Sequence, residues 1–193
     1  MFIPSNGKHR IPKIAKPLRD MGIHVIGVFD IDLLSNKDDL RKAIESFGGE
    51  WNGVEKQVHI LESQLGQNVT NINRSLFRSE VLGIIDGDTK KVLSIKEVKD
   101  IKDKLDITSK WGKIKKVGKN AIPPGQATIA FNEINEYLKE LGIHIVEIGE
   151  LENFNKNCGK HGPEWVAEVL ETYPNHKAPE YKEIREFVGE WNV

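Results

Sequence analysis

Two carboxylates separated by one residue follow the most apolar stretch in the N-terminal part of the chain. Asp30 and Asp32 come directly after residues 23–29, Ile-His-Val-Ile-Gly-Val-Phe, a run typical of a strand buried on both faces of a parallel sheet. Open α/β sheets bind ligands at the carboxyl ends of such strands. Oxygen ligands there predict a site for a hard divalent cation, Mg²⁺ or Mn²⁺. The alternative is that Asp30 ends the strand and Asp32 is a loop residue.

A second acidic motif follows a second apolar run. Residues 143–148, Ile-His-Ile-Val-Glu-Ile, are followed by Gly149-Glu150-Leu151-Glu152. If the two runs are neighbouring parallel strands, Glu150 meets Asp30 and Asp32 at one edge of the sheet. This arrangement would supply carboxylates for one ion or for a pair of ions, as in two-metal phosphodiester cleavage. Glu152 is the weaker candidate of the two glutamates.

Several lysines could contact phosphate. Gly7-Lys8 can offer backbone N–H groups and an ammonium. Lys160, just before the helix expected at 163, could stabilise charge on a scissile phosphate or simply be an exposed loop residue. Residues 90–119 carry 11 lysines and 4 acidic residues, although the net charge of the chain is only −1. Around Trp111 this segment predicts DNA or phosphate contacts, or else a solvated pair of helices, and its candidates are Lys110, Lys113, Lys115 and Lys116.

The elements that must position these groups fit a chain of 193 residues, of which 38% are hydrophobic and 30% charged. That length accommodates one domain, or one domain with an insertion, around a proper core. No apolar run reaches the roughly 18–20 residues of a membrane span, and the N-terminus does not resemble a signal peptide. The single cysteine, Cys158, favours a reducing, cytoplasmic compartment.

The hydrophobic periodicity predicts an α/β domain built from residues 1–48 and 120–193, with an insertion at 49–119. In the domain, helices are expected at 11–21, 38–47, 129–141, 164–172 and 178–187, and strands near 2–4, at 23–29 and at 143–148. The insertion is expected to be mainly helical, with a β-hairpin formed by 81–85 and 92–95 and a basic helical stretch over 96–116. Its apolar seam, Val54 to Leu76 at steps of three and four, packs on the parent domain or forms a dimer interface.

In this order the motifs resemble the C-terminal TOPRIM nuclease domain of OLD-family (overcoming lysogenization defect) ATP-dependent endonucleases. The stretches that carry the resemblance are 23–34 with Asp-x-Asp, 111–125 with Trp-x-x-x-Lys and Ala-Ile-Pro-x-Gly, and 146–170 with Gly-Glu-Leu-Glu and Lys-His-Gly-Pro-x-Trp-Val. The resemblance covers nearly the whole chain. It implies a TOPRIM-like parallel sheet flanked by helices.

The resemblance also implies a function in phage defence, as a metal-dependent DNA endonuclease using Mg²⁺ or Mn²⁺. Asp30, Asp32 and Glu150, with Glu152, would be the metal-binding carboxylates; Lys160 would face the scissile phosphate and Gly7-Lys8 would match a turn after a strand. TOPRIM domains begin with a glutamate-bearing strand and helix, and an ATPase domain usually precedes them. The chain is therefore expected to be a fragment whose metal site is one ligand short. A homodimer is expected by analogy.

Two other functions remain open at this point. In a haloacid-dehalogenase-type phosphatase, Asp30 would be the nucleophile. Such enzymes usually follow the Asp-x-Asp pair with a small residue and Thr or Val, whereas this chain has Leu33-Leu34. The other alternative is a non-catalytic regulatory or interaction module with a vestigial acidic cluster.

Overall fold

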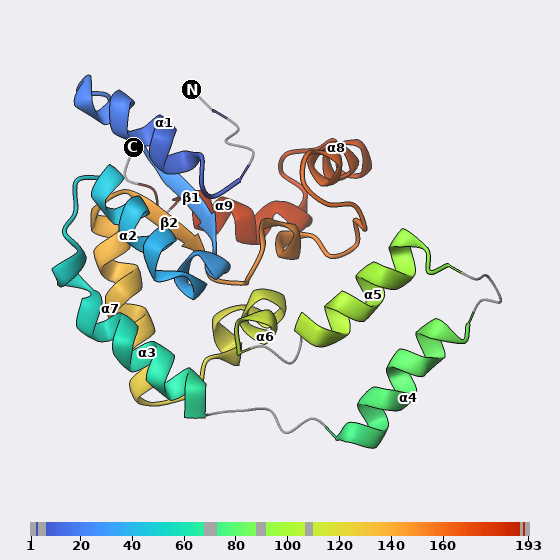
Figure 1. The fold of residues 1–193 in the computed structure, drawn as a ribbon. Helices are drawn as coiled ribbons and strands as arrows, with labels where there is room; N and C mark the ends of the chain where they lie inside the picture. Colours follow the sequence, from blue (N-terminus) through green and yellow to red (C-terminus); the bar gives the residue numbers. More distant parts are fainter. Residues whose placement is uncertain are drawn as a thin grey trace.

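The structure is a computed structural model that describes residues 3, 7–67, 73–87, 92–106, 110–189 and 191, without the side chains of 67, 103–106 and 110. Its centre is a parallel sheet of two short strands, β1 (Gly27–Asp30) and β2 (Ile143–Val146). Gly27 is opposite Ile143 and Asp30 is opposite Val146, so the two strands end side by side. Helices surround this ladder (Figure 1), and the fold is a mostly helical mixture of α and β structure.

The N-terminal helices match the predicted ones closely. α1 (Ile11–Asp20) carries Pro12 in its first turn, where a missing N–H costs nothing, and α2 (Lys37–Ser46) begins after Asn36. The Asn36 side chain accepts hydrogen bonds from the backbone N–H groups of Asp38 and Asp39, which caps α2. Short 3₁₀ turns follow the strands and link the helices: η1 (Ile31–Ser35), η2 (Trp51–Gly53), η3 (Gly118–Ala121), η4 (Leu151–Phe154) and η5 (Pro179–Tyr181).

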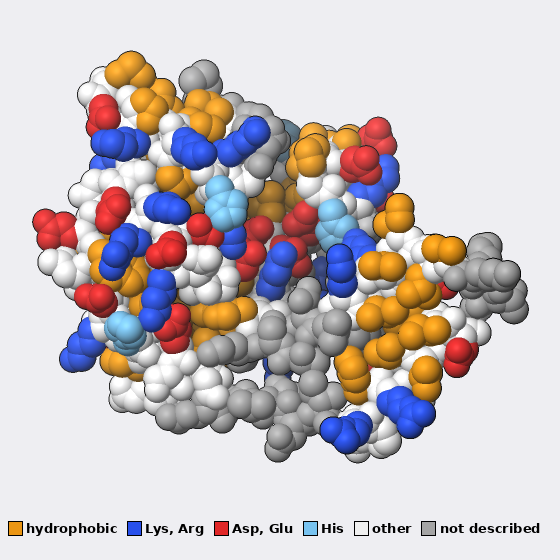
Figure 2. Space-filling view, in the orientation of Figure 1, with side chains coloured by type: hydrophobic (Ala, Val, Ile, Leu, Met, Phe, Trp, Pro, Cys, Tyr) orange, Lys and Arg blue, Asp and Glu red, His pale blue; other side chains and the backbone are white. Residues whose placement is uncertain are grey.

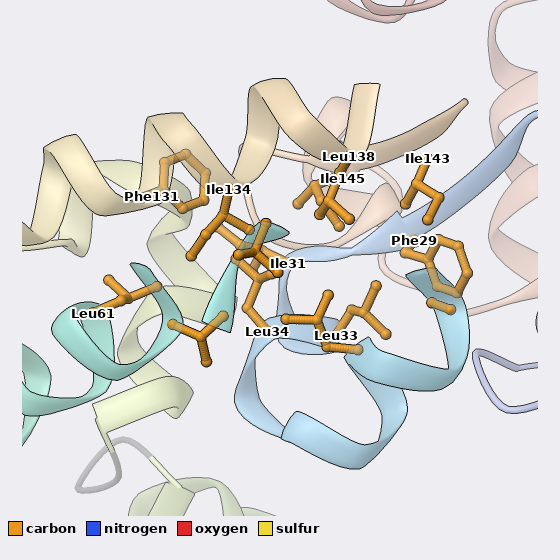
Figure 3. Close-up of a cluster of buried hydrophobic side chains, with 14 of the residues drawn as sticks. Phe29, Ile31, Leu33, Leu34, Leu61, Phe131, Ile134, Leu138, Ile143 and Ile145 are labelled. Atoms are coloured by element: carbon orange, nitrogen blue, oxygen red, sulfur yellow. The ribbon is translucent and has the colours of Figure 1, made fainter. Parts of the chain in front are cut away.

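The main core lies where α2, α3 (Glu55–Gln67) and α7 (Gln126–Glu140) pack around the strands. Figure 3 shows Leu61 of α3 on the side of Phe131 and Ile134 of α7, with the strand residues Phe29, Ile143 and Ile145 to their right. The predicted seam packs on the parent domain as far as Leu65, because Val54, Val58, Leu61 and Leu65 are all buried in this core. Of its remaining positions, Val69 and Ile72 lie outside the described residues and Leu76 is exposed.

A smaller cluster forms at the C-terminal end. α8 (Pro163–Thr172) buries Trp165 and Val169 against Cys158, while α9 (Lys182–Gly189) follows η5. The indole N–H of Trp165 donates to the carbonyl oxygen of Asn155 at 3.2 Å. This hydrogen bond ties α8 to the segment that leaves the sheet after β2. α9 begins four residues later than predicted because η5 precedes it.

The β-hairpin predicted in the insertion is wrong. Residues 81–85 form the last part of α4 (Arg74–Ile85), and α5 (Ile95–Asp106) begins where the second strand was expected. A short apolar run cannot distinguish a strand from a helix by periodicity alone. Capping residues favour helices in both places. The Asn73 side chain accepts hydrogen bonds from the N–H groups of Ser75 and Leu76 at the start of α4. Ser94 and Glu97 form a capping box at the start of α5.

The helices of the predicted insertion pack differently from one another. α3 contributes to the main core, and so does Ile114 of α6 (Lys110–Val117). α4 and α5 contribute none of the described residues of either cluster, and Figure 1 shows them extending away from the strands. These two helices expose Leu76, Leu82, Ile85, Ile95 and Val98, and the segment before α5 exposes Val92 and Leu93. The basic stretch predicted over 96–116 is thus split between α5 and α6.

The strands are shorter than their apolar runs predicted. β2 has only four residues, because the chain turns at Gly142 before it and again at Gly149 after it. β1 can form ladder hydrogen bonds only along those four residues. Residues 23–26 therefore lie outside the strand, and Ile23 is exposed. Of the strand predicted near 2–4, only Ile3 is described, and it has no strand assignment. Across the described parts of the chain, every helix is too short or too polar to cross a membrane.

Candidate functional site

The ends of the two strands bring the acidic motifs together. Asp30 is the last residue of β1, and its carboxylate oxygen Oδ1 accepts a hydrogen bond from the backbone N–H of Leu151 at 3.1 Å. The N–H of Ile31 donates to the carbonyl oxygen of Gly149 at 3.0 Å. The turn that carries Glu150 therefore lies directly against the chain that leaves β1. This is the juxtaposition expected from the sequence.

Burial of the intervening apolar residues orients the Asp-x-Asp pair. Ile31, Leu33 and Leu34 point into the main core, as Figure 3 shows. Asp30 and Asp32 remain half-buried. Since Ile31 is fully buried, its two acidic neighbours cannot follow it into the core without losing solvation, which costs several kcal/mol for an unpaired charge. Burial of Ile31, Leu33 and Leu34 thus keeps the carboxylates of Asp30 and Asp32 at the edge of the sheet.

A close backbone approach brings α6 to the same edge. Gly149 has φ +115°, and a Cβ there would overlap the carbonyl oxygen of Lys115. Gly118, at φ +77°, makes a similarly close approach to the carbonyl oxygen of Glu147. The side-chain amide of Asn153 adds a hydrogen bond to the carbonyl oxygen of Ile148 at 2.8 Å. Glycine at these positions lets the C-terminal half of α6 pack directly on the turn after β2.

Two lysines from different segments pair with the acids. Lys8 Nζ lies 3.4 Å from Asp32 Oδ1 and 3.3 Å from the Asp32 carbonyl oxygen. Lys115 Nζ lies 3.4 Å from Glu150 Oε2. Figure 2 shows acidic side chains gathered in the middle of one face, between the α1–α2 side and α8, with basic and histidine side chains beside them. We call Asp30, Asp32, Glu150 and Glu152 the acidic cluster.

The electrostatics of the cluster are coupled. Burial and repulsion from Asp32, Glu152 and Glu150 together raise the pKa of Asp30 to about 6, against the opposing effect of the hydrogen bond from Leu151. Burial lowers the pKa of Lys115, but the carboxylates of Glu150, Asp32 and Asp30 outweigh this effect and raise it overall. Lys115 is therefore an ammonium at neutral pH, and Asp30 bears much of the cost of crowding four acids.

Glu152 connects the cluster to the loop before α8. Its Oε1 accepts a hydrogen bond from the N–H of Gly162 at 2.8 Å and lies 3.8 Å from His161 Nδ1. Lys160 is in this loop, is exposed, and its N–H donates to Glu168 Oε2 at 3.1 Å. The loop of Lys160 is thus anchored to the cluster, but no described contact joins the Lys160 side chain to the acids.

The remaining predicted residues are spread over the surface. Gly7 has φ +119° and its carbonyl oxygen accepts from the N–H of Arg10, forming the turn that brings Lys8 to Asp32. Lys113 and Lys116 are exposed on α6, and the side chain of Lys110 lies outside the described part. Trp111 packs against the main core, so it anchors α6.

Carboxylate oxygens suit a hard divalent cation, but the four carboxylates of the acidic cluster are not arranged as a metal-binding site. Within the described ranges, no group of three or more His, Cys, Asp or Glu side chains could hold a metal ion. Two of the four acids face lysines instead. Asp30, Asp32 and Glu150 offer carboxylate oxygens at one sheet edge, the donor type that Mg²⁺ or Mn²⁺ prefers, and they would have to rearrange to hold such an ion together.

Sequence reasoning missed two sets of contacts near the site. It assigned Lys115 to a DNA-contacting surface, whereas this lysine points to Glu150. It also gave no role to Glu147, which accepts from Asn135 Nδ2 at 2.6 Å and pairs with Lys119, linking α7, β2 and η3. Lys115 and Glu150 are 35 residues apart, and a pairing over that separation leaves no periodic pattern in the sequence. The only hint was the position of Lys115 in the Trp-x-x-x-Lys stretch.

Comparison with known proteins gives no relative from which to assign a function: no family model, curated protein or solved structure matches the chain.

Proposed function

We propose that this chain is a metal-dependent phosphodiesterase domain that cleaves DNA, as the resemblance to the TOPRIM nuclease domain of OLD-family endonucleases implies. Asp30, Asp32 and Glu150 would hold Mg²⁺ or Mn²⁺, with Glu152 beside them. A divalent cation in that position would polarise the scissile phosphate. The cytoplasmic location, an upstream ATPase domain and a homodimer are parts of the same proposal.

One observation carries the proposal: the hydrogen bond from Leu151 N–H to the Asp30 carboxylate, which joins the ends of β1 and β2. Acids distant in the sequence thereby share one edge of a parallel sheet, where open α/β folds bind ligands. Burying Asp30 beside three other carboxylates is costly for folding alone, and its raised pKa is a sign of that cost. A functional site is a reason to retain such a cost.

The surface near the cluster supports a polyanionic substrate. Lys113, Lys116 and Lys119 are exposed around the helix that delivers Lys115 to Glu150. Lys160 is exposed in the loop anchored by Glu152. A phosphodiester approaching the acids would therefore meet ammonium groups from two segments, which offset its charge and that of the carboxylates.

A second candidate function is favoured by a different observation. Lys8 and Lys115 already neutralise Asp32 and Glu150, so the cluster can exist as a set of ion pairs without a cation. Under this alternative the chain is a regulatory or interaction module, and the acids hold α1 and α6 to the sheet. The phosphatase alternative gains no comparable support, since only the Asp-x-Asp spacing points to it.

The test combines metal binding with DNA nicking. We expect Mn²⁺ to bind in calorimetry and supercoiled plasmid to be nicked in Mg²⁺ or Mn²⁺ but not in EDTA. The double variant Asp30→Asn/Asp32→Asn should lose both, because two of three ligating charges are removed. The control Asp20→Asn/Asp86→Asn removes the same charge from exposed positions and should retain both.

The outcomes separate the two candidates. Loss of both activities in the cluster variant, with circular dichroism unchanged, supports the nuclease. Absence of nicking and of Asp30-dependent Mn²⁺ binding in the wild-type chain contradicts the nuclease proposal and favours the interaction module.

A further inference from the structure

The paired helices α4 and α5 present an apolar surface that the rest of the described chain leaves uncovered. They pack on each other and extend away from the strands (Figure 1), and none of their described side chains is buried. Each helix has 12 residues, a length at which a helix is marginal in water unless an apolar face is packed. These two helices therefore need a partner that covers their apolar side chains.

The exposed apolar residues gather where α4 ends and α5 begins. Figure 2 shows hydrophobic side chains collected over these two helices. Leu76 is on the opposite side of α4 from Ile85, because the two are nine residues apart at about 100° per residue. The α4–α5 patch is defined by the remaining large apolar residues, which are between 39% and 91% exposed: Leu82, Ile85, Val92, Leu93, Ile95 and Val98.

The size of the α4–α5 patch fits one side of a protein–protein interface. Its six residues expose on the order of 500 Å² of surface, and apolar patches of roughly 300–600 Å² on single chains are often functional. A standard interface buries roughly 800 Å² on each partner, including a polar rim. Exposed charged side chains next to the patch, Lys96 and Lys99 among them, can form that rim.

The charge of this region favours a second copy of the chain over a polyanion. Residues 74–106 carry eight Lys and Arg and seven Asp and Glu, whereas residues 110–119 carry five lysines and no acidic residue. The lysine excess thus begins after α5, so a nucleic acid or an anionic membrane gains little attraction at the patch. Two copies of a nearly neutral surface do not repel each other. Two-fold dimers, in which the same surface of each copy meets, are the commonest soluble oligomers.

We propose that the α4–α5 patch is a homodimer interface, covered by the same patch of a second copy. The four helices of the two copies would pack as a bundle that buries the apolar side chains. This inference rests on the homodimer of the proposed function and specifies the surface that joins it. It is independent of whether the acidic cluster holds a cation.

Sedimentation velocity of the full chain over a range of concentrations tests the interface. We expect the wild-type chain to be a dimer at micromolar concentrations. Leu82→Glu/Val98→Glu should raise the dimer dissociation constant about a hundredfold or more, because carboxylates buried without partners are costly. The control Val166→Glu/Leu170→Glu makes the same replacements at exposed positions of α8 and should leave the constant within about twofold of wild type.

A mixing experiment separates loss of the interface from loss of the fold. Leu82→Lys/Val98→Lys should also be a monomer on its own. Mixed with Leu82→Glu/Val98→Glu it should form a heterodimer, since ammonium groups of one copy then meet carboxylates of the other. The corresponding Lys and Glu variants of Val166 and Leu170 should show no preference for the heterodimer.

The outcomes distinguish the interface from the proposed function. Dissociation of the Glu variant with recovery on mixing supports the interface, and dissociation without recovery overturns it. A wild-type dimer that persists in both the Glu and the Lys variants overturns the interface but leaves the proposed homodimer standing. A wild-type monomer at every concentration overturns both, as does a monomer that instead binds phosphatidylserine vesicles through the patch. Plasmid nicking is measured separately, so the nuclease proposal stands or fails on its own test.

Discussion

Replacing Asp30 with asparagine should stabilise the fold at neutral pH. The carboxyl of Asp30 has a pKa of about 6, against an ordinary value of 3.8, because burial and the neighbouring acids disfavour its charged form. An asparagine at this position has nearly the same shape, and its amide oxygen can still accept the hydrogen bond from Leu151. The substitution removes the unfavourable charge without removing that contact.

The sign and size of the effect follow from proton linkage. Between about pH 4 and pH 6 the folded chain binds a proton at Asp30 more tightly than the unfolded chain does, so ionisation costs stability as pH rises through this window. The cost is absent below about pH 4 and complete above about pH 6. A shift of about two pKa units corresponds to about 3 kcal/mol, and solvent screening of a partly exposed group reduces this to about 1–2 kcal/mol.

Urea unfolding in EDTA at pH 4 and pH 8 measures the effect. The gain in unfolding free energy of Asp30→Asn over wild type should be about 1–2 kcal/mol at pH 8 and near zero at pH 4. Asp20→Asn, at an exposed position where Asp20 pairs with Lys16, should show no gain at pH 8. An Asp30→Asn variant that is destabilised at pH 8, or equally stabilised at both pH values, would refute the repulsion argument.

Two further predictions concern packing. Leu61→Ala should lower the unfolding free energy by about 2–5 kcal/mol in urea titrations, because Leu61 is fully buried between α3 and α7. Leu76→Ala, at an exposed position of α4, should change it by less than about 0.5 kcal/mol. Gly149→Ala should cost more than about 2 kcal/mol, because the new Cβ would overlap the Lys115 carbonyl oxygen at a positive φ; Gly159→Ala, where a Cβ meets open space, should be nearly neutral. A near-neutral Gly149→Ala would contradict the close approach of α6, and a large cost for Leu76→Ala would place α4 in a core.

Most helices of the fold could be predicted because their signals are local. Pro12, Asn36 and the spacing of the buried positions in α3 and α7 determine where those helices lie and which side they bury. The insertion was harder to predict because its apolar runs are short. The capping box of Ser94 and Glu97 was the local signal that could have replaced the predicted strand with a helix.

The candidate site could be predicted only in part. The apolar runs before Asp30 and Glu150 indicated that both residues follow strands, and the structure pairs those strands in parallel. The partners of the acids depend on contacts between distant segments. Lys8 comes from the turn before α1, and Lys115 comes from a helix whose approach depends on Gly149.

The amino-acid sequence alone determined the acidic motifs, the helical periodicity and the concentration of lysines, since each depends on residue types at short spacing. Only the tertiary structure decided which lysines face the acids, that α3 belongs to the main core, and that burial and neighbouring acids raise the pKa of Asp30. The physical reason is that burial and Coulomb interactions depend on distances in space. Those distances are set by the packing of whole helices against the two strands.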